Sequence, residues 1–347
     1  MNTERLSQGK VAWYRSPVTR EQLIALNQRS DFKGFVQTGG FLGLLALSGF
    51  AACYSVGRWP WPVVLFLFFI HGTFWRFILH GFHELIHNTV FKTKWLNQFF
   101  VRLFAFLIWY NHHQFWASHT EHHKYTLHPP DDLEVVLPAD LTLTKFLLRY
   151  FVDPWGFFVV LYNNVATAIG RPMRPWDRTL LANASPQERR AWINWSRFVL
   201  AGHGAILTVA FATHWWYLAA TVTLAPYYGG WLCYLCNNLQ HSGLRDNVQD
   251  FRLCCRTITV NPFLEFLYWH MNYHTEHHMY AAVPCYNLPK LHRLIEADLP
   301  RCPKGLFQGW KVLAAILKEQ KTDPTYQFSA QLPTPTPLSP DNQPTAA

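Results

Sequence analysis

The sequence is poor in charged residues, which make up only 15% of the 347 positions. An ordinary soluble domain carries roughly 25%. The deficit is concentrated, because no Asp, Glu, Lys or Arg occurs between residues 198 and 244. Half of the chain is hydrophobic and 17% is aromatic. The mean hydropathy of -0.03 hides this pattern, because it averages very apolar stretches with a polar start and tail. The composition favours an integral membrane protein.

Other protein classes are disfavoured by what the chain lacks. Seven cysteines are too few for a disulfide framework in a chain of this length. The net charge is +9, but no basic run is dense enough for a nucleic-acid patch. We therefore interpret the excess positive charge as facing a membrane surface. The polar N-terminal region shows no signal peptide.

Four apolar segments are predicted to cross the membrane, since a spanning helix needs about 20 mostly apolar residues. Residues 35–57 and 60–79 form a first hairpin. The uncharged stretch 198–244 is long enough for a second, with an outer turn near 214–216. Shorter apolar stretches at 99–110 and 157–170 are predicted to be interfacial or re-entrant helices. The expected fold is all-α, with about four transmembrane helices in two hairpins.

Two hairpins place the N-terminus, the segment 80–197 and the C-terminal third on one side of the membrane. Residues 1–34 contain six Lys and Arg, whereas the outer turns contain almost none. The positive-inside rule predicts that this shared side is cytoplasmic. We expect a cytosolic segment at 1–34, a membrane domain at 35–324 and a disordered tail at 325–347. A bacterial inner membrane is favoured over the endoplasmic reticulum.

The 18 histidines are clustered in three boxes. The first box has the spacing HxxxH, and the other two share the pentapeptide HTEHH, about 150 residues apart. Three histidines at such fixed offsets are expected by chance roughly 0.05 times in a chain of this composition, so two occurrences point to a function. The box histidines are His83 and His87, then His119, His122 and His123, and finally His274, His277 and His278.

This spacing predicts a metal site with two ions. Helical residues at i, i+3 and i+4 share one face, so each box directs its imidazoles the same way. Neutral imidazole binds Fe, Zn, Cu and Ni. Eight converging nitrogens are too many for one ion, because a structural zinc takes about four ligands. All three boxes also fall on the predicted cytoplasmic side. A ninth candidate, His241, follows the last crossing, with Asn237 one helical turn earlier.

These motifs together resemble the integral-membrane fatty acid desaturase family over about residues 35–300. "HELIH" followed by Asn88 and Phe91 is similar to the family's first box, HTEHH at 119 to its second, and "NYHTEHHMYAAVPCYNLPKLH" to its third. The resemblance implies two iron ions that activate O2, with Asn237 holding a metal-bound water. It implies nine ligands: His83, His87, His119, His122, His123, His241, His274, His277 and His278.

Several nearby residues are candidates for supporting roles. His80 lies three residues before His83, so it could replace or support a ligand of the first box. Glu84, Glu121 and Glu276 lie inside the boxes, where a carboxylate could orient a ligand imidazole. Three carboxylates after the second box could also orient a ligand imidazole or could only face solvent: Asp131, Asp132 and Glu134.

The predicted function is O2-dependent desaturation of a lipid or fatty acyl chain. No HPGG-like haem motif and no rubredoxin-like pair of CxxC motifs occurs, so we expect a separate electron donor such as a ferredoxin or cytochrome b5. The same site could instead act as a fatty acid or alkane hydroxylase, an acetylenase or an oxidative decarboxylase. A more remote alternative is a zinc protease, since His83, Glu84 and His87 form HExxH. A non-catalytic metal carrier or structural protein is a third alternative.

Overall fold

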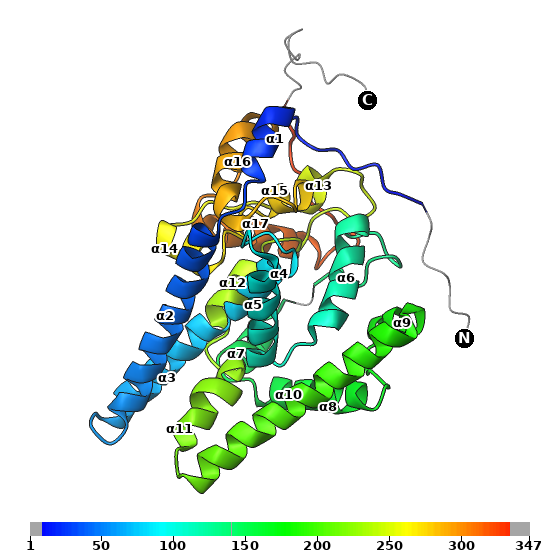
Figure 1. Cartoon of the computed structure of the whole chain (residues 1–347). Coiled ribbons are helices and arrows are strands. Elements are labelled where there is room, and N and C mark those ends of the chain that lie inside the picture. Colours follow the sequence, from blue (N-terminus) through cyan, green and yellow to red (C-terminus); the bar gives the residue numbers. More distant parts are fainter. Residues whose placement is uncertain (1–8, 140, 334–347) are drawn as a thin grey trace.

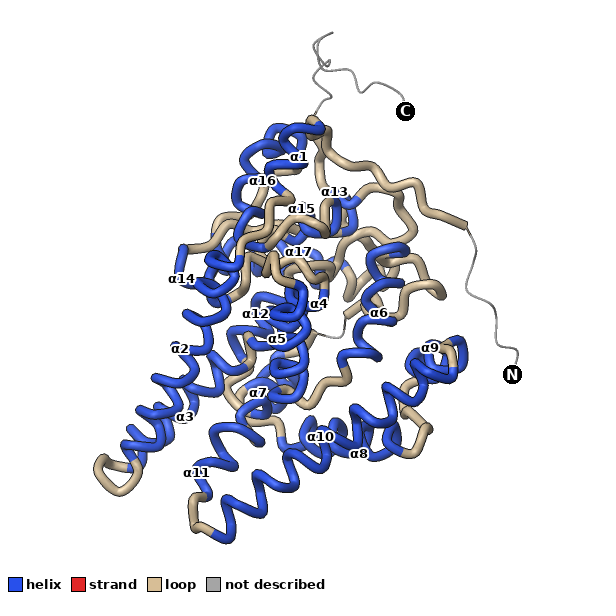
Figure 2. Tube along the Cα trace, in the orientation of Figure 1, coloured by secondary structure: helices blue, strands red, loops and turns tan. Residues whose placement is uncertain are grey.

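The structure is a computed structural model that describes residues 9–139 and 141–333. Its regular structure is helical (Figures 1 and 2), and the described residues contain isolated β-bridges but no strand. The predicted all-α membrane fold is therefore confirmed. The α-helices are α1 (Arg20–Leu26), α2 (Asp31–Ser55), α3 (Trp61–Trp75), α4 (Ile78–Ile86), α5 (Lys94–Leu107), α6 (His112–Tyr125), α7 (Leu143–Tyr150), α8 (Pro154–Ala168), α9 (Pro175–Asn183), α10 (Pro186–Ala212), α11 (Trp216–Leu218), α12 (Trp231–Asn237), α13 (Phe251–Cys254), α14 (Pro262–Leu267), α15 (His274–Met279), α16 (Leu288–Ile295) and α17 (Gly305–Glu319).

Within the described residues, three helical spans are long and apolar enough to cross a membrane: Asp31–Ser55, Trp61–Ile86 and Pro186–Ala212. The first two correspond to the predicted first hairpin. The second of these spans comprises both α3 and α4. The third begins earlier than expected because its N-terminus is well capped. Ser185 and Glu188 form a capping box there, with Pro186 in the first turn.

The predicted fourth crossing is interrupted. Between α11 and α12 the chain passes through a π-helical turn at Ala219–Thr223 and a 3₁₀ turn at Ala225–Tyr227. Gly229 follows with φ of +68°, and an added Cβ there would lie 2.5 Å from the backbone nitrogen of Thr73. The break therefore packs directly against α3. The sequence has no charge in this stretch, so composition alone could not reveal the interruption.

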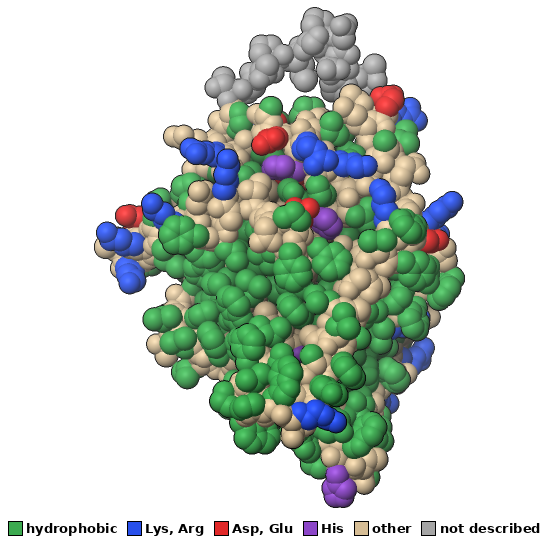
Figure 3. All heavy atoms as spheres, turned by 90° about the vertical axis from the view of Figure 1, so that its left-hand side faces the viewer, with side chains coloured by type: hydrophobic (Ala, Val, Ile, Leu, Met, Phe, Trp, Pro, Cys, Tyr) green, Lys and Arg blue, Asp and Glu red, His purple; other side chains and the backbone are tan. Residues whose placement is uncertain are grey.

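The surface of the α2–α3 hairpin is apolar. Leu47 and Phe50 on α2, and Leu65 and Phe66 on α3, are each exposed by at least 60%. In the view of Figure 3 hydrophobic side chains cover the middle and lower part of the molecule, while most Lys and Arg side chains lie near its upper end. Such a large apolar patch on a described face is suited to lipid.

The short helices α13, α15, α16 and α17 gather at one end of the hairpins (Figure 1). Two extended segments contact the protein next to this cap of helices. In the predicted N-terminal segment, Trp13 Nε1 donates to the carbonyl of Lys124 at 2.8 Å. Near the C-terminus, the amide of Phe328 donates to the carbonyl of Gly243 at 2.8 Å. The tail predicted to be disordered thus contacts the protein at residues 325–333, and its residues 334–347 lie outside the described part.

Close packing fixes the helix that carries the first box. Phe41 and Phe104 pack edge-on against Trp269, with ring centroids 5.6 and 5.8 Å away. Gly81 on α4 lies against the same aromatic rings, because an added Cβ would be only 2.5 Å from Phe104 and from Trp269. A residue without a side chain therefore lets α4 reach the core.

Candidate metal centre

The first box lies at the buried end of the second membrane span. His83 is on α4, and His87 caps that helix with helical φ and ψ angles, so both imidazoles stay on one face. Their ring centroids are 5.1 Å apart. The prediction that this box directs two imidazoles the same way agrees with the structure.

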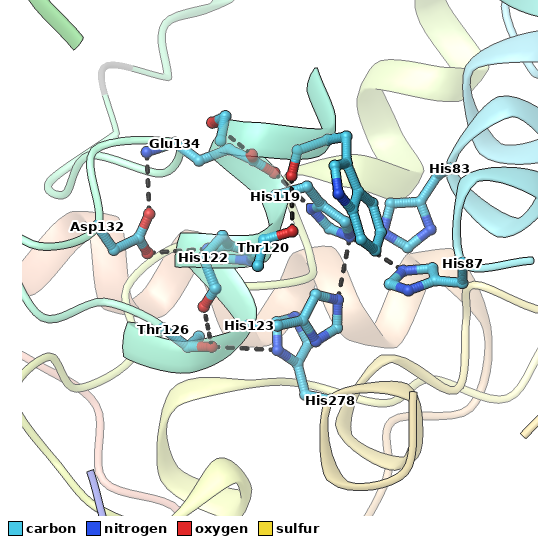
Figure 4. A network of polar contacts seen from close by, with 12 residues as sticks. His83, His87, His119, Thr120, His122, His123, Thr126, Asp132, Glu134 and His278 are labelled. Atoms are coloured by element: carbon cyan, nitrogen blue, oxygen red, sulfur yellow. Dashed lines mark hydrogen bonds and ion pairs between the residues drawn. The ribbon is translucent and has the colours of Figure 1, made fainter. Parts of the chain in front are cut away.

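The two HTEHH boxes divide their histidines in opposite ways. On α6, His119 and His123 share a face and point toward the first box (Figure 4), while His122 points away from it. On α15 it is His277 that joins the first box, as the ring centroid distance of 4.7 Å to His83 shows. Two of the three histidines on α6 therefore lie with the first box and one does not. On α15 one histidine lies with the first box and two do not.

The result is two groups of imidazoles. The five-histidine group contains His83, His87, His119, His123 and His277, whose possible ligand atoms all lie within 4.8 Å of one another. The four-histidine group contains His122, His241 and His278, which meet the same criterion, and His274, which contacts two of them. All nine predicted ligands are thus brought together, including the isolated His241.

The spacing of the Nε2 atoms suits metal coordination. His119 Nε2 lies 3.1 Å from His87 Nε2 and 3.0 Å from His123 Nε2. In the other group, His274 Nε2 lies 2.8 Å from His241 Nε2 and 3.2 Å from His278 Nε2. Two imidazoles bound at about 2.1 Å to one ion and roughly 90° apart have nitrogens about 3.0 Å from each other. The residues present fit two metal ions.

Hydrogen bonds at Nδ1 leave the Nε2 lone pairs directed inward. His241 Nδ1 donates to the Cys254 carbonyl at 2.8 Å, and His119 Nδ1 donates to Glu134 at 2.9 Å. His122 Nδ1 donates to Asp132 at 2.8 Å. An imidazole protonated at Nδ1 has a bare Nε2, which is the form that binds a metal. Lone pairs that converge on one point repel unless a cation lies between them.

Burial keeps most of these imidazoles neutral. Burial, together with neighbouring imidazoles, lowers the pKa of His119 and His123 well below the ordinary value. The same causes lower the pKa of His274 and His278. At His122 burial also acts to lower the pKa, but the Asp132 carboxylate outweighs it and the pKa is raised. Neutral imidazoles are ready to bind a metal without first losing a proton.

The predicted supporting residues are placed differently from one another. One oxygen of Glu84 lies 3.3 Å from His83 Nδ1, where a hydrogen bond forms, and 3.4 Å from His277 Nδ1, so this carboxylate lies between two boxes. Glu121 instead pairs with Lys124 at 2.8 Å. Glu276 points away from the imidazoles of its own box.

The oxygens of Glu276 instead accept short hydrogen bonds from Thr257 and His292. Asp132 and Glu134 do not only face solvent, because each accepts a hydrogen bond from a predicted ligand imidazole. Both approach α6 from the side opposite His83 (Figure 4). Sequence reasoning missed the backbone carbonyl of Cys254, since no side-chain pattern marks a backbone acceptor.

Asn237 and His80 meet beside the centre. His80 belongs to neither histidine group, and its Nε2 lies 2.6 Å from Asn237 Oδ1. Asn237 ends α12, one helical turn before His241. Asn237 stays a predicted water-mediated ligand, and His80 is its hydrogen-bond partner.

A cavity of about 740 Å³ leads to the five-histidine group. It reaches His87, His119 and His123, and Trp13 and Trp116 contribute to its walls. This is the size range of small-molecule sites.

The comparisons with known proteins agree with this geometry. The comparison with curated proteins gives no match. The family model described as fatty acid desaturase matches residues 59–310, well over half of the chain and including all three boxes and His241. A helical membrane protein whose boxes form groups that could hold metal ions, and whose sequence matches that family over this length, belongs to the fatty acid desaturase family.

Proposed function

We propose that the protein is a membrane di-iron, O2-dependent oxidoreductase that introduces a double bond into a lipid or fatty acyl chain. The observation that carries this proposal is the convergence of nine imidazoles in two groups, seven of them buried, with neighbouring Nε2 atoms 2.8–3.2 Å apart. Bound ferrous ions would supply O2 activation and the removal of hydrogen from an unactivated C–H bond. Electrons would come from a separate donor such as a ferredoxin or cytochrome b5.

The chain's own contribution is to hold and shield the ions. The five-histidine group would hold one iron and the four-histidine group the other, with Asn237 acting on the second through water. Asp132, Glu134 and the Cys254 carbonyl fix the tautomers of three ligands. Burial of all four histidines limits the access of water to the four-histidine group, whereas the cavity opens onto the five-histidine group.

The zinc protease alternative is disfavoured by the position of Glu84. In such an enzyme this carboxylate would act as general base on a metal-bound water. Here Glu84 lies 3.4 Å from Nδ1 of His277, whereas Nε2 of the same ring faces His123 at 3.2 Å. The carboxylate is thus at the outer edge of the ring. The alternatives of hydroxylation, acetylenation and decarboxylation share the same ligands, so the product decides among them.

We also propose the side and the limits of the membrane domain. The six Lys and Arg of residues 1–34 support a cytoplasmic position for the cap. The membrane domain would extend over 35–324. Glycosylation sites introduced on either side would test this topology. A bacterial inner membrane is the proposed location.

The decisive experiment is to express the intact chain with a reductase system and to profile new fatty acids, alcohols and hydrocarbons. We expect unsaturated acyl chains and about two irons in each chain. Replacement of His122 or His277 with alanine should abolish the product, while His214→Ala, at an exposed position outside both groups, should not. One zinc in each chain, or a product unchanged in both ligand variants, would overturn the proposal.

A further inference from the structure

His80 is the histidine of the first-box helix that joins neither metal group, although it is buried to the same degree. Its Nε2 lies 2.6 Å from Asn237 Oδ1, across 157 residues of sequence. His80 is three residues before His83, so both side chains lie on the same face of α4. The contact therefore joins the first-box helix to the helix that ends beside His241.

The chemistry of this contact fixes the state of both side chains. An amide oxygen can only accept a hydrogen bond, so Nε2 of His80 carries the proton. His80 Nδ1 is buried without a partner, which is tolerable for a lone pair and costly for an N–H group. The reversed arrangement would bury an N–H of His80 without an acceptor.

The carboxamide of Asn237 is thereby oriented. Its Oδ1 also accepts from the Tyr268 hydroxyl at 3.4 Å, and that hydroxyl accepts from Gln240 Nε2 at 2.9 Å. Asn237 Oδ1 therefore accepts from both the His80 Nε2–H group and the Tyr268 hydroxyl. Among the described residues no hydrogen bond joins Asn237 Nδ2 to an acceptor, so its N–H groups remain unused donors.

The ring of His80 cannot easily turn away from this position. It packs edge-on against Tyr268, with centroids 4.5 Å apart, and lies 5.4 Å from the ring of Phe77. Tyr268 and Phe77 are themselves almost completely buried. The orientation of His80 is thus set by packing and transmitted to Asn237 by one hydrogen bond.

We infer that His80 is a positioning residue, whose Nε2–H holds Asn237 so that the carboxamide presents its N–H donors to the four-histidine group. This inference rests on the proposed function, because it assigns Asn237 to an iron site. It makes Asn237 a hydrogen-bond donor beside that iron. It also excludes His80 as a ligand.

The test compares three variants of the full-length iron-loaded protein. His80→Phe keeps an aromatic ring in the slot but removes the donor, and His80→Gln restores an N–H donor. His203→Phe is the matched control, since His203 is also buried among aromatic rings but belongs to neither histidine group. Iron content, Mössbauer spectra of the reduced protein and turnover are measured on each.

We expect His80→Phe to retain about two irons in each chain, to alter the Mössbauer doublet of one iron only, and to lose about 10- to 100-fold in turnover. His80→Gln should recover most of that loss, and His203→Phe should lose little. Combining His80→Phe with Asn237→Ala should be no worse than Asn237→Ala alone, because both changes remove the same interaction.

Two results would overturn the inference. Loss of one iron in His80→Phe would make His80 a ligand, and an unchanged doublet and turnover would show that Asn237 does not depend on it. Failure of the proposed function is distinguishable from both, because it would appear in the unmodified protein as missing iron or missing product. The Mössbauer comparison needs no identified substrate.

Discussion

His122 Nδ1 donates to the carboxylate of Asp132 at 2.8 Å, and neither side chain is more than 3% exposed. Asp132 also accepts from the Leu127 and Glu134 amides at 2.8 and 2.9 Å. The loop after α6 thus folds back to hold the one histidine of that helix that reaches the four-histidine group.

Asp132→Asn should weaken iron binding in the four-histidine group. The amide is a poorer acceptor for His122 Nδ1, and loss of such a supporting contact costs about 10- to 100-fold in metal affinity or activity. Iron retained after dialysis against graded chelator measures the effect. Glu121→Gln is a matched control, since Glu121 lies in the same region and pairs with Lys124 instead of a histidine. Equal iron retention in the two variants would contradict the prediction.

His274→Ala and His277→Ala should damage different halves of the centre. Each removes a ligand from the same short helix, but His274 belongs to the four-histidine group and His277 to the five-histidine group. We expect both variants to lose activity, each with a change at a different iron in the Mössbauer spectrum. His128→Ala, whose Nδ1 donates to the Thr126 carbonyl at 2.9 Å, should keep both irons. Identical spectra for the two ligand variants would argue against separate groups.

Gly81→Ala should destabilise the protein by about 1–3 kcal/mol, because its Cβ would force Phe104 or Trp269 to move. Gly43→Ala is the control. It lies on α2 with nothing within 4 Å of an added Cβ, and alanine is the better helix former there. Thermal unfolding in detergent compares the two. A lower melting temperature in Gly43→Ala than in Gly81→Ala would contradict this account of α4 packing.

The contribution of Glu265 to stability should depend on pH. Burial acts to raise its pKa, but hydrogen bonds from His270 at 3.0 Å and Tyr273 at 2.9 Å outweigh burial, and the pKa is lowered. A carboxylate with a lowered folded pKa stabilises fully above its unfolded pKa of about 4.3, and the benefit disappears as the pH falls through the folded pKa.

Glu265→Gln should therefore melt below the unmodified protein at pH 7, and the difference should shrink on acidification below about pH 4.3. Melting temperatures across this range provide the measurement. Glu319→Gln, at the exposed end of α17, is the control. A difference that grows on acidification would show the opposite sign of the shift.

Local spacing allowed much of the centre to be predicted. The i, i+3, i+4 spacing on a helix predicted that His119 and His123 converge. The distribution of Lys and Arg predicted that all three boxes lie at the same end of the molecule. Spacing could not show that α15 turns His277 toward one group and His274 toward the other, because that depends on how α15 is rotated against α6.

Other features depend on contacts between distant segments. The bond between His80 and Asn237 joins residues 157 positions apart. Glu276 was expected to orient an imidazole because it lies inside the third box, but a six-residue helix that is buried on all sides directs it to Thr257 and His292 instead. The interrupted fourth crossing arises from packing of Gly229 on α3, which hydropathy does not report.

The opposite division of the two HTEHH repeats would make bound metal ions part of the protein's architecture. Since α6 and α15 each donate to both groups, iron would act as a pair of cross-links between segments about 150 residues apart. A chain without iron would leave a cluster of uncompensated lone pairs at the point where four segments meet. We therefore expect iron supply to set how long the folded protein survives in the cell, in addition to how fast it works.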